Sequence, residues 1–320
     1  MQCMDVEQAA IEDRFRRAAL AVVDGDLRTL RKLLAAFPSL VHERSPAPFR
    51  ATLLHYVAAN GVEDELQRTP DNAVDICETL LAMGAAPDAL AESYGGGRNQ
   101  TPLCLLVSSW HPMERGLHGQ LVRALVQGGA CVNGLDDDGA PLATALVFGY
   151  TGASEALAAC GARIDNIFFA AGLGDLARVK TFVGPVETNT VDANTVDANT
   201  VDPVAQLSAT ALGSYRSPLG EPNETNRARI AQQALHFAVT HGRTDVVDFL
   251  LARGAEANGE VAGHHCALPL LQALFVHEVA MARHLVTRGA DPDREDRKRH
   301  TTARALATSR GQAEFLAALE

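Results

Sequence analysis

The sequence predicts an all-α solenoid of about eight helix-turn-helix repeats joined by short β-hairpin-like finger loops. The first observation is a unit that returns along the chain: an amphipathic helix, a Gly, a second helix, then a Gly-Ala pair and an Asp- or Asn-bearing loop. The second is the spacing of the C-terminal copies, about 33 residues, which is typical of stacked helix pairs. The third is composition: 47% of residues are hydrophobic but only 5% are aromatic, so thin layers of Ala, Leu and Val are expected.

One copy of the unit is nearly complete and defines its parts. It starts at Gln233 as QALHFAVTHG and continues as TDVVDFLLARGAEANG. Other first helices are predicted in TLLHYVAANG, TPLCLLVSSW, APLATALVFG and TTARALATSRG, which start at Thr52, Thr101, Ala140 and Thr301. The Gly-Ala pairs that follow the second helices start at Gly84, Gly129, Gly161, Gly254 and Gly289.

Each part of the unit has a physical role. Thr52 and Thr101 are suited to cap a first helix, because a threonine hydroxyl accepts a hydrogen bond from a free backbone N–H. Pro102 stands at a position where a missing N–H costs nothing. The run VVDFLL has its apolar residues at helical spacing and predicts the buried face of a second helix. Glycines that adopt a left-handed backbone are expected to end the first helices, at Gly61, Gly149, Gly174, Gly242 and Gly311.

These motifs together resemble the ankyrin repeat, and the chain resembles a bacterial-type multi-repeat ankyrin protein. The main departure from the family pattern is residues 184–232. The resemblance implies a concave face lined by the residues just before each first-helix Gly and by the finger loops. It also implies that His55 and His236, at the His of the Thr-Pro-Leu-His element, bond loop backbone of adjacent units rather than act in catalysis.

The ends of the chain are expected to be capping repeats. Residues 9–43 predict a first helix pair without the Thr-Pro-Leu-His element, and residues 301–320 predict a last pair without a Gly-Ala loop. Between them, VEDELQRTPDN is predicted as a surface loop inside the second unit, and PDALAESYGGGRNQ as a flexible finger before the third. The outer face of the first pair is expected to be solvated by Glu12, Asp13, Arg14, Arg16 and Arg17.

Residues 184–232 divide the chain into repeats at 1–183, an insertion, and repeats with a cap at 233–320. The insertion contains the tandem NTVDANTVDANTVD from Asn189 to Asp202, whose period of five matches neither a helix nor a strand. A solvated loop grown by repeat slippage is the favoured interpretation. The alternative is a flap that folds back across the concave face, because a short helical run follows the Gly, Pro and Ser residues of its second half.

Charge and cysteine usage restrict the partner and the compartment. The net charge of −11 argues against nucleic acid, since phosphate attraction needs clustered Lys and Arg, and a basic or neutral partner is easier to accommodate. The six cysteines lack paired metal-ligand spacing and are expected to be buried reduced thiols. No apolar run has the length of a signal peptide or of a membrane span. We therefore expect a cytoplasmic protein without a membrane partner.

Candidate binding residues follow from the positions that the resemblance assigns to the concave face and the fingers. The concave positions are Ser109, Phe148, Leu173, His241 and Phe275, and the finger residues are Tyr94, Arg98, Asp136, Asp137, His264 and His265. Trp110 and His111 replace the expected Gly of the third unit and, with Tyr150, are expected near the rim of the groove. An exposed apolar patch usually marks a binding site. The alternative is that Phe148 and Phe275 tilt into the core between repeats.

No metal, cofactor or catalytic motif is predicted. His264, His265 and Cys266 are the only local cluster of metal-binding side chains, but a structural zinc site needs four ligands, so the cluster is expected to cap a helix start and face solvent. The string SYGGGRNQ lacks the spaced glycines of a phosphate loop. The acidic string from Asp136 to Asp138 is too compact for a calcium loop and is expected to be a charged turn.

The sequence thus favours a non-enzymatic protein–protein interaction module, a scaffold, regulator or inhibitor, that binds a partner through its concave face and finger loops. The alternative is a small-molecule-binding or catalytic groove closed by residues 184–232. In that case His241 is the best-placed general base, although it is a weak candidate.

Overall fold

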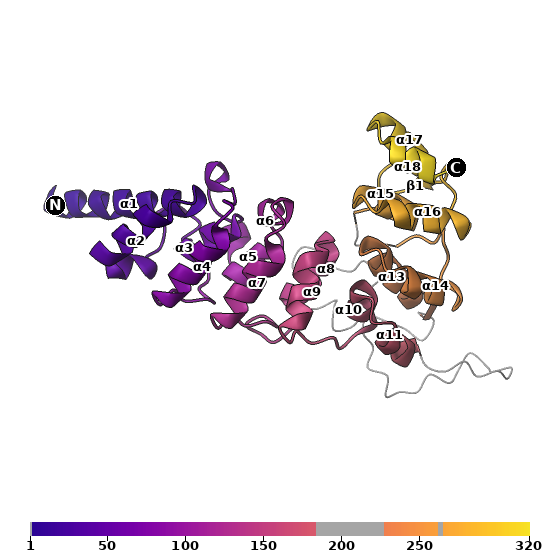
Figure 1. Cartoon of the computed structure of the whole chain (residues 1–320), viewed down its shortest axis with the longest axis horizontal. Coiled ribbons are helices and arrows are strands. Elements are labelled where there is room, and N and C mark those ends of the chain that lie inside the picture. Colours follow the sequence, from indigo (N-terminus) through magenta and orange to yellow (C-terminus); the bar gives the residue numbers. More distant parts are fainter. Residues whose placement is uncertain (1, 184–226, 262–264) are drawn as a thin grey trace. The chain divides into compact units, whose positions relative to one another are not determined.

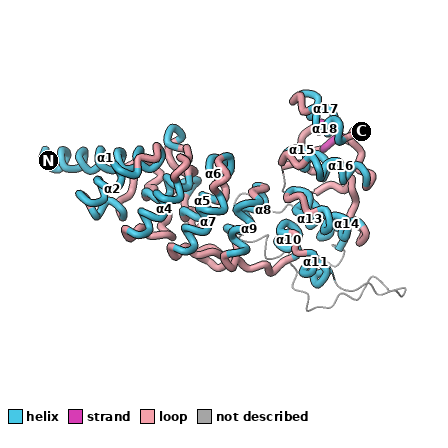
Figure 2. Tube along the Cα trace, viewed as in Figure 1, coloured by secondary structure: helices cyan, strands magenta, loops and turns pink. Residues whose placement is uncertain are grey.

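The computed structural model describes residues 2–183, 227–261 and 265–320, which group into two compact units, residues 1–163 and 164–320 (Figure 1). The tandem from Asn189 to Asp202, and with it most of the expected insertion, lies outside the described residues, as does His264. Helices dominate the described chain, as predicted (Figure 2). Among the described residues, no helix combines the length and the apolar character needed to cross a membrane.

The first unit consists of four helix pairs and one additional short helix. The pairs are α1 (Gln2–Val23) with α2 (Leu27–Ala36), α3 (Leu53–Ala58) with α4 (Ala73–Ala82), α5 (Pro102–Leu106) with α7 (His118–Gln127), and α8 (Ala140–Phe148) with α9 (Thr151–Ala159). The additional helix is α6 (Trp110–Glu114), and three 3-10 turns lie in the connections, η1 (Pro38–Val41), η2 (Asp64–Leu66) and η3 (Ser93–Gly95).

The second unit continues with four further described pairs. These are α10 (Ile167–Leu173) with α11 (Leu176–Val183), α13 (Arg227–Thr240) with α14 (Thr244–Leu251), α15 (Pro269–Phe275) with α16 (Val279–Thr287), and α17 (Ala303–Ser309) with α18 (Ala313–Ala318). Helices α10 and α13 pack against each other, so the described pairs that precede and follow residues 184–226 in the sequence are neighbours in the second unit. The eight described pairs confirm the predicted all-α solenoid of repeats.

The predicted start and stop signals act at the ends of the first helices. The Thr101 hydroxyl accepts a hydrogen bond from the Cys104 N–H at 3.3 Å and caps α5, and the Thr302 hydroxyl caps α17 in the same way at 3.1 Å. At the turn after α3, Gly61 has a φ of 67°, a left-handed backbone that glycine adopts without strain. The seventh pair places His277 at this turn with a φ of 64°, so the turn forms there without a glycine.

One finger forms the predicted β-hairpin. Strand β1 (Glu295–Asp296) pairs antiparallel with β2 (Thr301–Thr302), with Glu295 opposite Thr302 and Asp296 opposite Thr301. The Asp296 side chain is fully buried, and its carboxylate accepts four backbone hydrogen bonds. The donors lie in this finger, at Lys298 and Arg299, and in the chain before α15, at Ala267 and Leu268, all at 2.7–2.9 Å. This carboxylate therefore joins two successive fingers.

The Asp or Asn of three Gly-Ala loops joins its repeat to the next. The Asp88 carboxylate accepts the Cys131 N–H at 3.1 Å, and the Asn133 carbonyl oxygen accepts the Arg163 N–H at 3.0 Å. In the second unit, the Asn258 carbonyl oxygen accepts the Asp291 N–H at 2.8 Å. We call these contacts the loop bridges. They satisfy backbone donors that would otherwise be exposed, and they fix the position of each loop against its neighbour.

Buried histidines also connect neighbouring elements, as the resemblance implies. The His55 Nδ1 accepts the Thr52 N–H at 3.0 Å, which leaves Nε2 to donate to the Gln100 carbonyl at 3.0 Å. Burial lowers the pKa of His55 to about 4 and that of His236 to about 3. The sequence did not single out His118, but burial lowers its pKa to about 4 as well, and its Nε2 lies 3.0 Å from the Leu106 carbonyl oxygen. All three side chains are therefore neutral parts of the core.

Several local expectations are corrected. The loop VEDELQRTPDN is not wholly at the surface, because Val62 and Leu66 are buried against the second repeat. Arg14 is not on a fully solvated face: its guanidinium pairs with Glu43 at 2.9 Å and lies over the Phe37 ring. Of the five cysteines whose side-chain burial the structure describes, three are buried thiols, whereas Cys131 is exposed and Cys160 is half-buried, because both follow the end of a second helix.

The buried neutral histidines predict that stability falls as the solution is acidified. Between pH 6.5 and about 4, His118 becomes protonated in the unfolded chain but stays neutral in the folded chain. The stability that depends on this neutral side chain, about 3 kcal/mol, is present above pH 6.5. It is lost as the pH falls to about 4. Urea unfolding followed by circular dichroism should show a flatter pH dependence for His118→Gln than for wild type. Substitution of the exposed His300 by Gln is the control. Parallel pH curves for wild type and His118→Gln would contradict this assignment.

The four hydrogen bonds to Asp296 predict a large effect of removing its carboxylate. Asp296→Ala leaves four backbone donors without their acceptor, and one unsatisfied buried donor costs about 1–3 kcal/mol, so a loss of about 3 kcal/mol or more is expected. The measurement is the urea midpoint of the purified protein. Glu295→Ala, which removes the exposed neighbouring carboxylate, should change the midpoint little. An equal effect of both substitutions would show that the Asp296 bonds contribute nothing specific.

Candidate functional site

The predicted binding residues of the first unit differ widely in exposure. Tyr94 is 72% exposed and Trp110 is 56% exposed, the highest values among the large hydrophobic side chains of the described residues. The other exposed or half-buried members of the predicted set in this unit are Arg98, Asp136, Asp137, His111, Phe148 and Tyr150. A partner can therefore contact these side chains without rearrangement of the repeats.

Two predicted binding residues are instead part of the interior. Ser109 is 2% exposed, and its hydroxyl donates to the Ala59 carbonyl at 3.1 Å, so it ties the end of α5 to the end of α3. His241 is 3% exposed, and its N–H bonds to the Phe237 carbonyl as α13 ends. The predictions that Ser109 and His241 line an open face are therefore wrong. His241 cannot act as a general base for a ligand in the groove while it occupies this position.

Tyr94 is presented by a strained finger. Its backbone lies in the left-handed region, with φ 49° and ψ 33°, which is unfavourable for a residue with a bulky side chain. Gly95, Gly96 and Gly97 follow, also with positive φ, and a side chain added at any of them would meet nothing within 4 Å. Steric crowding therefore does not require these glycines; they let the chain reverse sharply just after Tyr94. Strain of this kind persists only where other contacts hold it, and it is concentrated at functional sites.

A hydrogen-bond chain holds the Tyr94 side chain. The Tyr94 hydroxyl donates to the side-chain oxygen of Asn60 at 2.6 Å, and the side-chain NH₂ of Asn60 donates to the Ser108 hydroxyl at 2.8 Å. The Ser108 hydroxyl in turn donates to the Leu105 carbonyl at 3.0 Å. The finger is thus tied through its exposed aromatic residue to the ends of α3 and α5. Asn60 and Ser108 each lie two residues beyond the last residue of a first helix, at positions that the resemblance assigns to the concave face.

Trp110 lies two residues beyond Ser108, at the start of α6. In this repeat α6 stands where most first helices are followed by a left-handed glycine and the seventh pair has His277. Figure 1 labels α6 next to α5 and α7. His111, the next residue, is half-buried. We define the aromatic surface as Tyr94, Asn60, Ser108 and Trp110. It combines two exposed aromatic rings with a polar connection between a finger and two first helices.

Ion pairs fix the fingers next to the aromatic surface. The Arg98 guanidinium pairs with Asp136 and donates to the Leu135 carbonyl at 2.9 Å. Asp137 pairs with Arg163, at the next Gly-Ala loop. These pairs are exposed and each contributes less than about 1 kcal/mol, but together they connect three successive loops. Their charges are largely neutralised within the chain, which agrees with the predicted charged turn.

Phe148 and Tyr150 form a separate aromatic contact in the fourth repeat. The Tyr150 ring stacks on Phe148, with 5.7 Å between centroids, and lies 4.9 Å from the His118 ring. Burial raises the pKa of Tyr150, and both aromatic side chains are half-buried. Phe148 thus packs partly between helices, as one of the two sequence interpretations expected. Trp110, His111 and Tyr150, expected near the rim of the groove, lie in this unit, whereas the general-base candidate His241 is buried in the other unit.

The second unit places three of its predicted residues in half-buried positions. Leu173 ends α10, and His265 stacks on Phe275 with 4.7 Å between ring centroids. Arg299 and Arg310 also lie against the Phe275 ring, and the sequence prediction missed both. Arg310 could have been found, because it precedes Gly311 as His241 precedes Gly242. The contact of Arg299 depends on the path of its finger and has no sequence signal.

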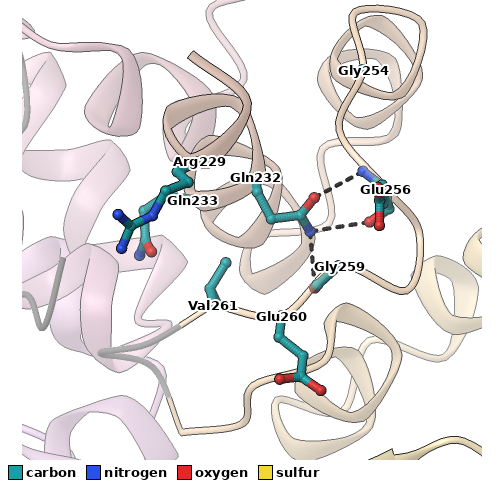
Figure 3. Close-up of a pocket in the computed structure, with 8 residues that line it drawn as sticks. All are labelled: Arg229, Gln232, Gln233, Gly254, Glu256, Gly259, Glu260 and Val261. Carbon is teal, nitrogen blue, oxygen red and sulfur yellow. Dashed lines mark hydrogen bonds between the residues drawn. The ribbon is translucent and has the colours of Figure 1, made fainter. Parts of the chain in front are cut away.

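A hollow of 220 Å³ lies beside α13, at the point where the stack rejoins after residue 226 (Figure 3). Its centre is Gln232, whose amide donates to the Glu256 and Gly259 carbonyls at 3.0 Å and whose oxygen accepts the Glu256 N–H at 2.8 Å. Glu256 holds the position that receives a loop bridge in other repeats. Gln232 therefore makes the equivalent hydrogen bond here, and its side-chain amide holds the loop that lines the hollow.

Cys266 and the acidic turn do not form a metal centre within the described residues. Cys266 is fully buried, which contradicts the prediction that its cluster faces solvent, and its N–H donates to the Gln272 side chain at 3.1 Å. Burial raises the pKa of its thiol to about 12. In the part of the chain that the structure describes, no three His, Cys, Asp or Glu side chains are placed to hold a metal ion.

Comparison with known proteins agrees with the repeat pattern. The sequence model of the family described as ankyrin repeat matches residues 232–259, which cover the later part of α13, all of α14 and the following loop. No curated protein sequence matches the chain. Among solved structures, the crystal structure of the human ASB11 ankyrin repeat domain is similar, with 21% sequence identity, 84% of this chain and 96% of that chain covered, and a TM-score of 0.32.

The exposure of Trp110 can be checked directly, because it is the only tryptophan in the chain. Its fluorescence should be quenched readily by acrylamide in the folded protein, though less than after unfolding in urea, because 56% of the side chain is exposed. Trp110→Phe should abolish the signal. A blue-shifted emission that acrylamide barely quenches would place the ring in the interior and remove it from the aromatic surface.

Proposed function

We propose that this ankyrin-repeat protein is a protein–protein interaction module whose partner docks on the aromatic surface of Tyr94, Asn60, Ser108 and Trp110. Its repeat at 232–259 matches the ankyrin family, and ankyrin repeats are generally protein-binding modules. The aromatic surface combines a finger with the ends of two first helices. It thereby occupies the region that sequence resemblance assigned to partner binding.

The observation that carries the proposal is the exposed Tyr94 ring on a left-handed backbone, held by the hydrogen bond to Asn60. Leaving a large aromatic ring in water forgoes the free energy of its burial. Tyrosine and tryptophan are enriched among the residues that dominate interface energies, since they supply large contact area for little loss of side-chain freedom. A Tyr94 ring fixed before binding costs less to order in the complex.

The proposal leaves the catalytic alternative without its base, because His241 is buried. A role as scaffold, regulator or inhibitor follows from binding alone and needs no reacting groups. A cytoplasmic location belongs to the same proposal. It is supported by the exposed thiol of Cys131, whose pKa is raised by its hydrogen bond to the Asp88 carboxylate and which persists best in a reducing compartment.

The test is quantitative capture from a native lysate with immobilised wild type, Tyr94→Ala/Trp110→Ala and Met83→Ala. Met83 is 44% exposed at the end of α4 and controls for the loss of an exposed apolar side chain elsewhere in the same unit. The double substitution should release a protein that wild type and Met83→Ala both retain, because loss of two dominant interface residues costs about 4 kcal/mol or more in binding.

The captured protein is then purified and titrated against wild type. Trp110 emission should shift to the blue as the ring is covered, and Asn60→Ala should weaken binding by loosening Tyr94. Retention of the same proteins by wild type and by the double variant would overturn the proposal. Unchanged circular dichroism of the double variant excludes unfolding as the cause of lost capture.

A further inference from the structure

One stretch, from the last finger to the end of α17, reverses the acidic character of the chain. Residues 294–310 contain six arginine or lysine residues and two acidic residues, in a protein of net charge −11. One of the two acids is the buried Asp296, whose carboxylate is committed to backbone N–H groups. The exposed surface of this segment is therefore strongly cationic.

Three of the six cations have carboxylate partners, whereas two arginines do not. Arg294 and Arg297 share Glu260, at 3.9 and 3.3 Å, and Arg304 pairs with Asp293 at 2.9 Å. Within the described chain, no carboxylate lies within ion-pair distance of Arg299 or Arg310, and both side chains are exposed. These two guanidinium groups are the cations of the segment that remain available to an external anion.

The two guanidinium groups converge on one aromatic ring. The central carbon of Arg299 lies 4.7 Å from the centre of the Phe275 ring, and that of Arg310 lies 5.9 Å from it. His265 stacks on the same ring. A guanidinium that stacks on an aromatic ring is restrained, yet the N–H groups at its edge can still form a bidentate pair with a carboxylate. Two such guanidinium groups beside a half-buried apolar ring can therefore bind a ligand that carries a carboxylate next to an apolar side chain.

The finger that carries Arg299 is held in place before any ligand arrives. The Asp296 carboxylate accepts the Arg299 N–H at 2.9 Å, and the Arg299 Nε donates to the His265 carbonyl at 2.7 Å. Phe275 ends α15 and Arg310 caps the end of α17, so both are set by successive first helices. Phe275, Arg299 and Arg310 thus come from two first helices and a finger, the same kinds of element that form the aromatic surface in the other unit.

We propose that Phe275, Arg299 and Arg310 form a binding site for an acidic segment of a protein partner, with a carboxylate at the two guanidinium groups and an apolar side chain on the Phe275 ring. This site rests on the proposed function and names the chemistry of the partner. Nucleic acid is the less suitable occupant, because phosphate binding relies on many unpaired cations and three of the six basic residues here already pair with carboxylates.

The test uses a fluorescein-labelled peptide of alternating glutamate and leucine, a glutamine–leucine peptide as the neutral control, and a single-stranded DNA oligonucleotide. Fluorescence anisotropy with the full-length protein should show binding of the acidic peptide, weakened by added salt, and no binding of the neutral one. Arg299→Gln/Arg310→Gln should raise the Kd by about tenfold or more, because two charge-assisted contacts are lost. Arg310→Gln alone leaves the Arg299 bond to His265 intact and should still raise the Kd.

The matched control is Arg283→Gln/Arg288→Gln on α16, which removes the same charge from the same unit and should leave the Kd nearly unchanged. An equal loss in both double variants would show general attraction and overturn the site. So would the absence of peptide binding, or DNA binding that is tighter and depends on the same two arginines. Tyr94→Ala/Trp110→Ala should keep peptide binding. If the acidic peptide does not bind but capture from the lysate still depends on Tyr94 and Trp110, this site alone is refuted. If capture does not depend on those residues, the proposed function is refuted.

Discussion

The structure depends on hydrogen bonds to the backbone N–H groups of the loops that join its repeats. A solenoid has no single core that could fix all of its loops, because each repeat packs only on its neighbours. Here a side-chain oxygen of one repeat accepts a backbone N–H of the next, at Asp88, Asn133 and Asn258. Where the insertion interrupts the sequence of Gly-Ala loops, Gln232 makes the equivalent bond. The loops can therefore keep the same relation to the helices even though the connections between them differ in length.

Loops held in this way can carry rigid binding groups. Asp296 uses its whole carboxylate to fix two fingers, and that fixes the backbone of Arg299. In the first unit, the chain from Tyr94 through Asn60 to Ser108 does the same for an exposed aromatic ring. Both candidate surfaces therefore combine a finger with the end of a first helix. Preorganised side chains lose less freedom on binding, which is why such positions suit recognition.

Net charge alone is a poor guide to the partner of this protein. The chain is acidic overall, and that composition favoured a basic or neutral partner. The structure distributes the charges unevenly: Arg98 is neutralised by Asp136 in one finger, whereas Arg299 and Arg310 face no carboxylate among the described residues. Recognition depends on the local field at a rigid site, and charges beyond about 10 Å are screened at ordinary salt.

The sequence by itself determined the helix pairs, their order and the turns between them, because capping Thr, left-handed Gly and apolar helical spacing act through near neighbours in the chain. It also identified Tyr94 and Trp110 as candidate contacts. Only the tertiary structure decided that Ser109 and His241 are buried, and that Arg299 belongs to a candidate site. The point at which a first helix ends, and the way it packs on its neighbours, decide whether a side chain there faces the open side or the interior. Contacts between repeats set that packing, and the local sequence carries no signal of it.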